Sequence, residues 1–334
     1  MNDTRTAIPM GLKHILDAIY ADPEVHLPEL MDWVDRMYPE AGPSGSVTYA
    51  LLKQACSDRT GGLYRWLGSL FRDIDAQTLY HLSENYILHA DWTGHHAAAA
   101  ADSRTVTCLV DDGPKVFGQR CDTILSFDAL DAVVTEERER GIHRFLIAGD
   151  EPLQHKRELV AVANKHSRCT FWVLTGGKLI DERFARDLLR TGNVIPLLTR
   201  EKLDGTPAQA SEILHTFRVL FGMLVSGSEP AADQDRAIEQ GAKEVLLITD
   251  PYALGYGTPP QDRTIGQSMG DTPDLTLPVR LWRLKRENGR DARWMLDDAR
   301  HLVIDSLGIA GIVNDSGEDS GFAHILRLRE VAPA

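Results

Sequence analysis

Hydrophobic and polar positions divide the chain into three stretches with different periodicities. In residues 1–96, apolar side chains recur every three or four positions, which predicts a helical N-terminal region. Residues 104–252 alternate near-continuous apolar runs with helical patterns. Residues 253–334 open with a segment rich in Gly, Pro and Asp and form a third region. The helices expected in the first region cover 11–21, 26–38, 47–55, 63–74 and 75–90.

The middle region predicts an α/β fold with a parallel sheet. Uninterrupted apolar runs are typical of parallel strands covered on both faces, and helical segments lie between them. Right-handed crossovers would curl such a sheet into a partial TIM-like barrel of six β/α units, and a doubly wound sheet is the alternative. The expected strands are 105–111, 144–149, 170–176, 193–200, 220–227 and 244–250. The expected helices are 126–141, 153–166, 181–192, 207–220 and 231–242, with Ser126 and Asp181 as N-caps.

The third region is expected to be a small irregular and β-rich C-terminal extension. Residues 255–274 predict an irregular loop, residues 301–315 a β-hairpin, and residues 324–331 one more strand. The local basic stretch 280–290 is interpreted as a solvated face with a buried Leu/Trp stripe.

Charge and composition narrow the choice of partners. The chain has 334 residues and a formal net charge of −13, with 49 acidic against 36 basic residues. A nucleic-acid partner is therefore not expected. No apolar run has the length of a signal peptide or a membrane span, and the four cysteines are scattered. We expect a cytoplasmic protein with reduced thiols and no membrane partner.

Polar residues and glycines follow each predicted strand. Carboxyl ends of parallel strands meet at one edge of the sheet, and this edge holds the site in such folds. The pattern alone predicts a pocket without naming its ligand. The candidate cofactor-binding residues at this edge are Gly149, Asp150, Glu151, Pro152, Thr175, Gly176, Thr199, Glu201 and Thr249.

Three motifs at the ends of the second, third and fourth strands carry a family resemblance. They are Gly149-Asp150-Glu151-Pro152, Thr175-Gly176-Gly177, and a stretch containing Asn193, Pro196, Thr199 and Glu201. With "LSFDALDAVV", "ENYILHADWTG" and "RHLVIDSLGIAGIV", this pattern resembles the radical S-adenosylmethionine (radical SAM) superfamily. It is most similar to the branch with a helical N-terminal region and a C-terminal iron–sulfur extension. The resemblance is densest over 125–203, and it implies a barrel whose rim binds S-adenosylmethionine.

The cysteines that this family needs for its chemistry are missing. The resemblance implies a C-x-x-x-C-x-x-C motif after the first strand, whose thiolates hold a [4Fe–4S] cluster. If Cys108 takes the first position, Asp112 and Lys115 take the other two, and Cys121 lies at the wrong spacing. One thiolate cannot hold such a cluster, and no cysteine follows Cys169 to serve the extension. We therefore expect no iron–sulfur cluster and no other metal site.

Binding of S-adenosylmethionine itself stays open at this point. Asp150 replaces a glycine of the family motif and would repel the methionyl carboxylate. Glu151, Pro152 and Glu201, in contrast, match the family pattern. The expectation is a chain with no bound cofactor, with S-adenosylmethionine as the one candidate.

These features favour a non-catalytic radical-SAM-like protein, a pseudoenzyme. It would act as a partner or substrate-positioning subunit of another protein, such as a cluster-bearing radical SAM homologue, in a biosynthetic or maturation pathway. The alternative is a repurposed enzyme that binds S-adenosylmethionine or a related nucleoside for methyl transfer or hydrolysis. Its candidate acids, bases or cation ligands are Asp112, Asp150, Glu151, Glu201 and His155. A third reading is an active enzyme whose cluster is held by Cys108, Cys121 and residues of a partner. No residue is assigned a catalytic role.

Overall fold

The computed structural model describes residues 4–37, 53, 56–60, 62–85, 105–110, 126–139, 142–148, 151–199, 206–226, 237–248, 280–286, 294–296, 300–304 and 310–314. Its helices are α1 (Thr4–Ala21), α2 (Pro23–Met37), α4 (Gly62–Asp73), α5 (Ala76–Glu84), α6 (Phe127–Glu139), the 3-10 turn η2 (Pro152–His155), α7 (Lys156–Lys165), α8 (Glu182–Thr191) and α9 (Thr206–Thr216). Its strands are β1 (Thr105–Leu109), β2 (Arg144–Ala148), β3 (Thr170–Thr175), β4 (Val194–Thr199), β5 (Gly222–Ser226), β6 (Glu244–Ile248), β7 (Arg280–Arg286), β8 (Trp294–Leu296), β9 (Arg300–Ile304) and β10 (Ala310–Asn314).

The strands form one sheet in the order β10-β9-β1-β2-β3-β4-β5-β6-β7-β8. Every pairing from β9 through β1 to β7 is parallel. The strands β10 and β8 add to the two ends of this parallel array in antiparallel orientation. The sheet thus follows chain order from β1 to β7, and the C-terminal strand β9 adds beside β1.

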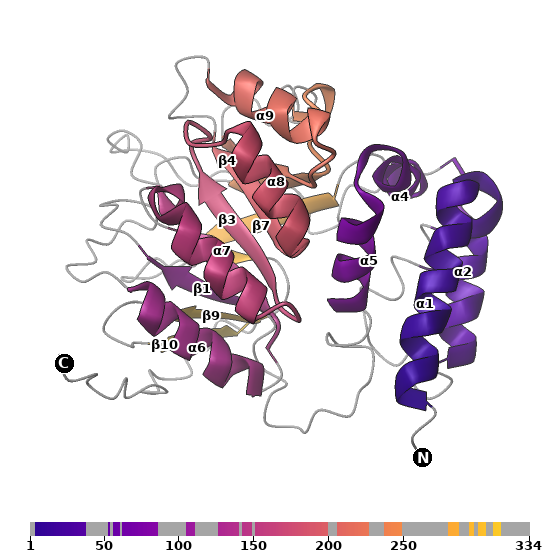
Figure 1. Cartoon of the computed structure of the whole chain (residues 1–334), viewed down its shortest axis with the longest axis horizontal. Coiled ribbons are helices and arrows are strands. Elements are labelled where there is room, and N and C mark those ends of the chain that lie inside the picture. Colours follow the sequence, from indigo (N-terminus) through magenta and orange to yellow (C-terminus); the bar gives the residue numbers. More distant parts are fainter. Residues whose placement is uncertain are drawn as a thin grey trace.

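This strand order agrees with a barrel-like sheet rather than a doubly wound one. Successive parallel strands added in one direction through right-handed crossovers place their helices on a single face. Helices α6, α7, α8 and α9 do share one apolar core with the sheet, and Figure 1 shows α6, α7 and α8 side by side across it. The sheet also curls far enough for β8, at one end, to contact β9, next to the other end. The fold is therefore α/β and TIM-barrel-like.

Successive residues of the central strands belong alternately to two apolar cores. In β2, Phe145 and Ile147 belong to the core shared with helices α6–α9, whereas Leu146 and Ala148 belong to the core shared with the N-terminal helices. The strands β3 and β4 alternate in the same way, as expected when successive side chains point to opposite faces. Both faces of β2–β4 are consequently apolar and buried, which explains why their sequences are uninterrupted apolar runs.

The N-terminal helices fasten to the turns that precede the strands. The amide nitrogen of Asn85, at the end of α5, donates to the carbonyls of Ser167 (3.1 Å) and Cys169 (3.3 Å), just before β3. The indole of Trp66 in α4 donates to the carbonyl of Lys243 (2.7 Å), just before β6. Figure 1 shows α5 beside the starting end of β3, with α1 and α2 farther from the sheet.

The turn before β5 both accepts hydrogen bonds from the N-terminal helical region and donates hydrogen bonds to it. The backbone N–H of Asp75 donates to the carbonyl of Arg218 (2.9 Å), and the Arg218 guanidinium donates to the carbonyls of Arg72 and Ile74 (3.0 Å each). Before β4, the His81 ring packs against Gly192 so closely that a Cβ there would lie 3.0 Å from its Nδ1. The helices α4 and α5 therefore line the amino ends of β3 to β6.

Local sequence signals anticipated most of the described elements. The six predicted strands of the middle region all form, each within two residues of its expected bounds. Ser126 accepts a hydrogen bond from Ala129 N–H (3.2 Å) and Asp181 from Phe184 N–H (2.7 Å), so both are N-caps. Gly192 ends α8 with φ 67°, the left-handed conformation that favours glycine. The predicted helix 47–55 lies almost wholly outside the described residues.

The C-terminal region differs from its expectation in one respect. The β-hairpin forms, with β9 and β10 paired antiparallel. No strand was predicted for residues 280–286, but they form β7, which pairs parallel with β6. Together with the pairing of β9 to β1, this makes the extension part of the main sheet. The predicted loop 255–274 and strand 324–331 lie outside the described residues.

Within the described part of the chain, none of the helices combines the length and apolarity that a membrane crossing requires.

Candidate functional site

Five of the nine predicted site residues lie in the described part of the chain. Glu151, Pro152, Thr175, Gly176 and Thr199 follow or end β2, β3 and β4, at the carboxyl edge of the sheet. The other four, Gly149, Asp150, Glu201 and Thr249, lie outside the described residues. Parallel pairing of β2 with β3 and of β3 with β4 places the described five along one rim.

The Glu151 carboxylate is occupied by groups of its own chain. Its Oε1 accepts hydrogen bonds from the hydroxyl of Thr175 (2.7 Å) and the backbone N–H of Leu153 (3.2 Å). Its Oε2 accepts from the backbone N–H of Gly176 (2.9 Å). A carboxylate offers about four lone-pair directions, so three internal donors use most of its capacity. Glu151 thereby joins the loop after β2 to the loop after β3.

The loop after β3 is also closed by internal contacts. The Thr175 hydroxyl, which donates to Glu151, accepts from the backbone N–H of Gly177 (3.0 Å), and the Thr199 hydroxyl donates to the carbonyl of Thr175 (3.3 Å). Gly177 adopts φ 80°, and a Cβ there would lie 3.1 Å from the Cβ of Ala210. The turn therefore requires glycine for its backbone and for the close approach of α9. The hydroxyl groups of Thr175 and Thr199 therefore form hydrogen bonds within the edge of the sheet.

Pro152 and the start of the next helix have a local explanation as well. Glu151 is the N-cap of η2, and Pro152 takes the first position of that turn, where a missing N–H costs nothing. His155, exposed at the start of α7, lies against Phe127 with ring centroids 5.3 Å apart. The helix-start interpretation of Glu151-Pro152 thus accounts for the geometry seen here.

Two asparagines with equally specific contacts were not among the predicted site residues. Asn193 is fully buried, and its Nδ2 donates to the carbonyls of Ala163 (3.0 Å), His166 (3.2 Å) and Cys169 (2.9 Å). Asn85 donates to the same turn, at the carbonyls of Ser167 and Cys169. A buried polar residue beside a strand was the available signal, but its acceptors are set by the tertiary fold.

Cys108, the residue that would take the first position of the cysteine motif, lies inside β1 rather than after it. Its side chain has 0% exposure and belongs to the core shared with α6 and α7. Burial, and secondarily the negative charge of Glu137, raise the pKa of the Cys108 thiol well above its usual range. Metal binding requires the thiolate, so this position does not suit a cluster ligand. The residues at Asp112, Lys115 and Cys121 lie outside the described part.

The remaining titratable groups of the described region do not assemble a metal centre. Within those residues, no group of three or more His, Cys, Asp or Glu side chains is arranged to hold a metal ion. Burial raises the pKa of Cys169 to about 12, although Arg138 opposes the shift.

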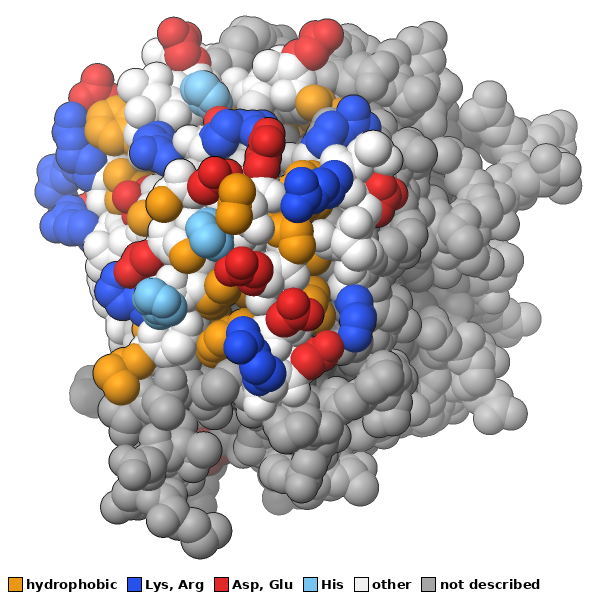
Figure 2. All heavy atoms as spheres, turned by 90° about the vertical axis from the view of Figure 1, so that its right-hand side faces the viewer, with side chains coloured by type: hydrophobic (Ala, Val, Ile, Leu, Met, Phe, Trp, Pro, Cys, Tyr) orange, Lys and Arg blue, Asp and Glu red, His pale blue; other side chains and the backbone are white. Residues whose placement is uncertain are grey.

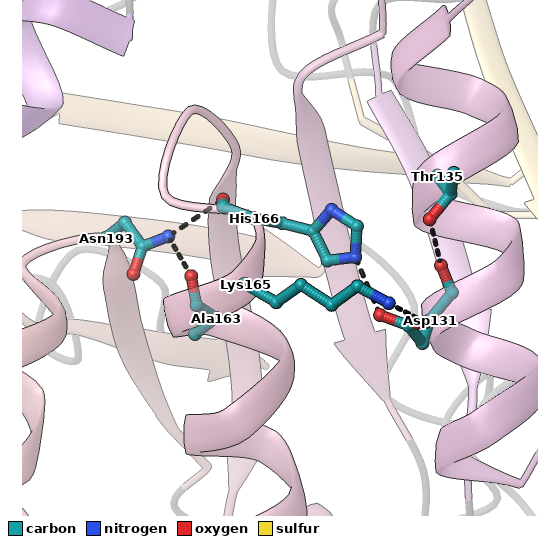
Figure 3. A network of polar contacts seen from close by, with 6 residues as sticks. All are labelled: Asp131, Thr135, Ala163, Lys165, His166 and Asn193. Atoms are coloured by element: carbon teal, nitrogen blue, oxygen red, sulfur yellow. Dashed lines mark hydrogen bonds and ion pairs between the residues drawn. The ribbon is translucent and has the colours of Figure 1, made fainter.

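A polar network lies apart from the rim, between α6 and α7 (Figure 3). Asp131 on α6 accepts from Nε2 of His166 at 2.8 Å and from Nζ of Lys165 at 2.5 Å. The His166 ring is 1% exposed, whereas Lys165 is largely solvent-exposed. Asn193 holds the carbonyl of His166, so the network continues into the turn before β3. Its position at the amino ends of the strands indicates a structural role.

Comparisons with known proteins agree with the fold only. No family model and no curated protein matches the sequence. Among solved structures, the chain is similar to SuiB of Streptococcus suis bound to its precursor peptide SuiA, with 12% identity and a TM-score of 0.38 over 46% of this chain and 42% of SuiB. It is similar to the radical S-adenosylmethionine methyltransferase TsrM of Kitasatospora setae, with 13% identity and a TM-score of 0.30 over 44% of this chain and 36% of TsrM.

Tryptophan synthase of M. tuberculosis is a further structure of this kind, with 14% identity and a TM-score of 0.33 over 47% of this chain and 68% of that one. The matched region spans less than half of the SuiB and TsrM chains. TM-scores this low carry no argument about function. They describe a distant resemblance to radical SAM enzymes and to another TIM-barrel-like protein.

Proposed function

We propose that this chain is a radical-SAM-like protein without radical chemistry of its own. It acts as a partner or substrate-positioning subunit, alongside a cluster-bearing enzyme in a biosynthetic or maturation pathway. The observation that carries the proposal is the Glu151 carboxylate. Its match to the family motif is accounted for by three hydrogen bonds to Leu153, Thr175 and Gly176, with no cofactor required.

The other family-like residues support the same reading. Asn193, Asn85 and Gly177 each have a specific role in holding turns of the fold. The cysteines, which would have a purely chemical role, are the part of the pattern that the sequence lacks. A fold that keeps its structural residues and lacks its metal ligands is suited to binding and positioning.

The environment of Cys108 supports the expected lack of a cluster. Cys108 is buried in the core within β1, and its raised thiol pKa favours the protonated, non-ligating form. No step of a mechanism is therefore assigned to an iron–sulfur cluster in this chain.

Anaerobic reconstitution with iron and sulfide, followed by metal analysis and electron paramagnetic resonance, tests the proposal. We expect no four-iron spectrum and no cleavage of S-adenosylmethionine under reducing conditions. Detection of either would refute the proposal directly. A reconstituted radical SAM enzyme with its three cysteines serves as the positive control.

Isothermal titration with S-adenosylmethionine at millimolar concentration separates a binding subunit from a repurposed enzyme. We expect no heat of binding for the wild type or for Glu151→Gln. Saturable binding by the wild type that Glu151→Gln weakens would favour the repurposed enzyme.

Native mass spectrometry of the purified chain with its co-purifying protein then tests for a complex of fixed stoichiometry. A monomer in every preparation would count against a partner role.

A further inference from the structure

The segment from η2 to the end of α8 has a charge opposite to that of the chain as a whole. Residues 151–192 contain eight Lys or Arg and five Asp or Glu, whereas acidic residues exceed basic ones over the full sequence, 49 to 36. The outer helices of this segment, α7 and α8, carry most of these charges on exposed positions. This outer face therefore differs electrostatically from the rest of the molecule.

Most acidic groups of this face are already neutralised. Asp181 accepts from Lys156 Nζ (2.9 Å) and caps α8, Glu182 pairs with Arg186 (2.9 Å), and Asp187 pairs with Arg190. Burial disfavours the charged form of Asp181. However, the hydrogen bonds from Lys156 and Phe184 N–H, with the charges of Lys156 and Arg183, outweigh burial and lower its pKa. Asp181, Glu182 and Asp187 are therefore each paired with a cation of the same segment.

Three cations of this segment have no acidic partner among the described residues, and a fourth, Arg183, interacts with Asp181 without forming an ion pair there. Arg157 in the first turn of α7, Arg168 after its last turn and Lys178 before α8 are exposed, and none has an acidic partner among the described residues. Glu158 is the one exposed acidic residue of the segment that has no basic partner among the described residues. The surplus on this face is therefore positive.

The spacing of these cations suits an extended segment. Lys156 Nζ binds the carbonyl of Leu179 at 2.7 Å, which brings the start of α7 beside the loop that carries Lys178. Arg168 lies at the other end of α7, about 15 Å away at 1.5 Å per residue. An extended peptide of about five residues spans that distance.

The face over the N-terminal helices provides the contrast. Figure 2 shows Lys and Arg interspersed with Asp and Glu on that side. Several of those charges are paired, as in Lys13 with Asp17 (2.9 Å), Lys53 with Asp35 (3.1 Å) and His26 with Glu29 (2.9 Å). Such a surface has no net preference for a charged partner.

We propose that the outer face of α7 and α8, through Arg157, Arg168 and Lys178, binds an acidic segment of a partner protein. The existence of that partner rests on the proposed function. A protein segment is favoured over nucleic acid because the chain as a whole carries −13 and would repel a long polyanion. A short acidic segment interacts mainly with the local face, since charges are screened beyond about 8 Å at physiological salt.

Fluorescence anisotropy of a labelled decaglutamate peptide with the full-length chain tests this proposal. The variant reverses the three cations together, as Arg157→Glu, Arg168→Glu and Lys178→Glu. The matched control reverses three cations of the N-terminal helical region, as Lys13→Glu, Arg36→Glu and Arg59→Glu, with the same change in net charge. Circular dichroism establishes that both variants fold.

We expect the α7–α8 variant to bind the peptide at least about tenfold more weakly than the wild type, and the control within about twofold, with the difference shrinking at high salt. Equal losses in both variants, or no binding by the wild type, would overturn the proposal. A single-stranded oligonucleotide that binds this face as tightly as decaglutamate would overturn its assignment to a protein segment. The iron and S-adenosylmethionine measurements are independent of these results, so failure of this inference is distinguishable from failure of the proposed function.

Discussion

The amino ends of the strands and their carboxyl rim are both held by hydrogen bonds, but the two sets connect different parts of the chain. At the amino ends, Asn85 and Trp66 bind turns that lie 82 and 177 residues away along the sequence. At the rim, Glu151 binds Thr175, 24 residues away on the next strand. The amino end fastens the helical region to the sheet, whereas the contacts in the described part of the rim join neighbouring strand ends to one another.

This difference indicates how the two ends divide their tasks. In TIM-like barrels the amino end serves stability and the carboxyl end carries function. Here the described rim residues also stabilise the fold, because Glu151, Thr175 and Thr199 bond to one another or to adjacent backbone. In the described part of the rim, these contacts therefore contribute to stability, as the contacts at the amino ends do.

Substitution of Asn193 is expected to have the largest effect on stability. Asn193→Ala removes the Nδ2 donor from three buried carbonyls. His166 O and Cys169 O keep other donors, the Cys169 N–H and Asn85 Nδ2. The cost therefore comes mainly from the lost hydrogen bonds, at about 1 kcal/mol each, and we expect a loss of about 2–3 kcal/mol. Urea unfolding followed by circular dichroism measures it. Asn164→Ala, at an exposed position of α7, is the matched control and should change the free energy of unfolding by less than about 0.5 kcal/mol. If both substitutions changed the free energy of unfolding equally, the hydrogen bonds of Asn193 to the turn before β3 would have no special importance for stability.

Asn85→Ala tests whether the amino end couples the helical region to the sheet. The variant loses two hydrogen bonds to the carbonyls of Ser167 and Cys169, and we expect a cost of about 2 kcal/mol. Hydrogen exchange should quicken both in α5 and in the turn 166–169, although they are far apart in sequence. Faster exchange confined to α5 would show that the two segments are not coupled through this side chain.

Glu151→Gln tests the rim with the side-chain size preserved. The glutamine amide nitrogen cannot accept from Gly176 or Leu153, so one rim contact is lost and we expect a cost of about 1–2 kcal/mol. Exchange of the Gly176 amide should quicken, and Glu158→Gln on the exposed face of α7 should leave both quantities unchanged. Unchanged stability in Glu151→Gln would mean that the carboxylate is held for a ligand rather than for the fold.

The sequence was sufficient for the strands because their signal is local. Runs such as 170–176 are apolar on both faces, and this follows directly from burial between two layers. Strand β7 was missed because its basic residues resemble a solvated surface, and its pairing with β6 spans the residues between Ile248 and Arg280. The choice between a barrel and a doubly wound sheet likewise depends on the direction of crossovers, which no local pattern specifies.

The rim was predictable in outline and not in its contacts. Parallel strands necessarily bring Glu151 and Thr175 to one edge, but the sequence does not reveal that the carboxylate accepts from three internal donors. The roles of Asn85 and Asn193 were equally hidden, since their acceptors are carbonyls of a turn formed only in the folded state. The burial of Cys108, in contrast, could be predicted from the sequence. Side chains alternate along β1, and this places Cys108 on the face that packs against the core shared with α6–α9.

The Asp131 network allows a smaller test, based on pH. Partial burial raises the pKa of the Asp131 carboxyl, but hydrogen bonds and positive charges from Lys165 and His166 outweigh it and hold the pKa below the ordinary value of 3.8. A carboxyl with a lowered folded-state pKa contributes stability that is present above its unfolded pKa and is lost as the pH falls through the folded value. Asp131→Asn should therefore cost about 1 kcal/mol at neutral pH, with little difference from the wild type once the pH is well below 3.8. Urea unfolding of both proteins across this pH range measures the difference in the free energy of unfolding. The control is Asp17→Asn on α1, whose ion pair with Lys13 is exposed. We expect the control to change the free energy of unfolding by less than about 0.5 kcal/mol. A cost that stays constant with pH would mean that the α6–α7 contact depends on packing of the His166 ring, and that charge at this amino-end network contributes no more than charge on the open surface.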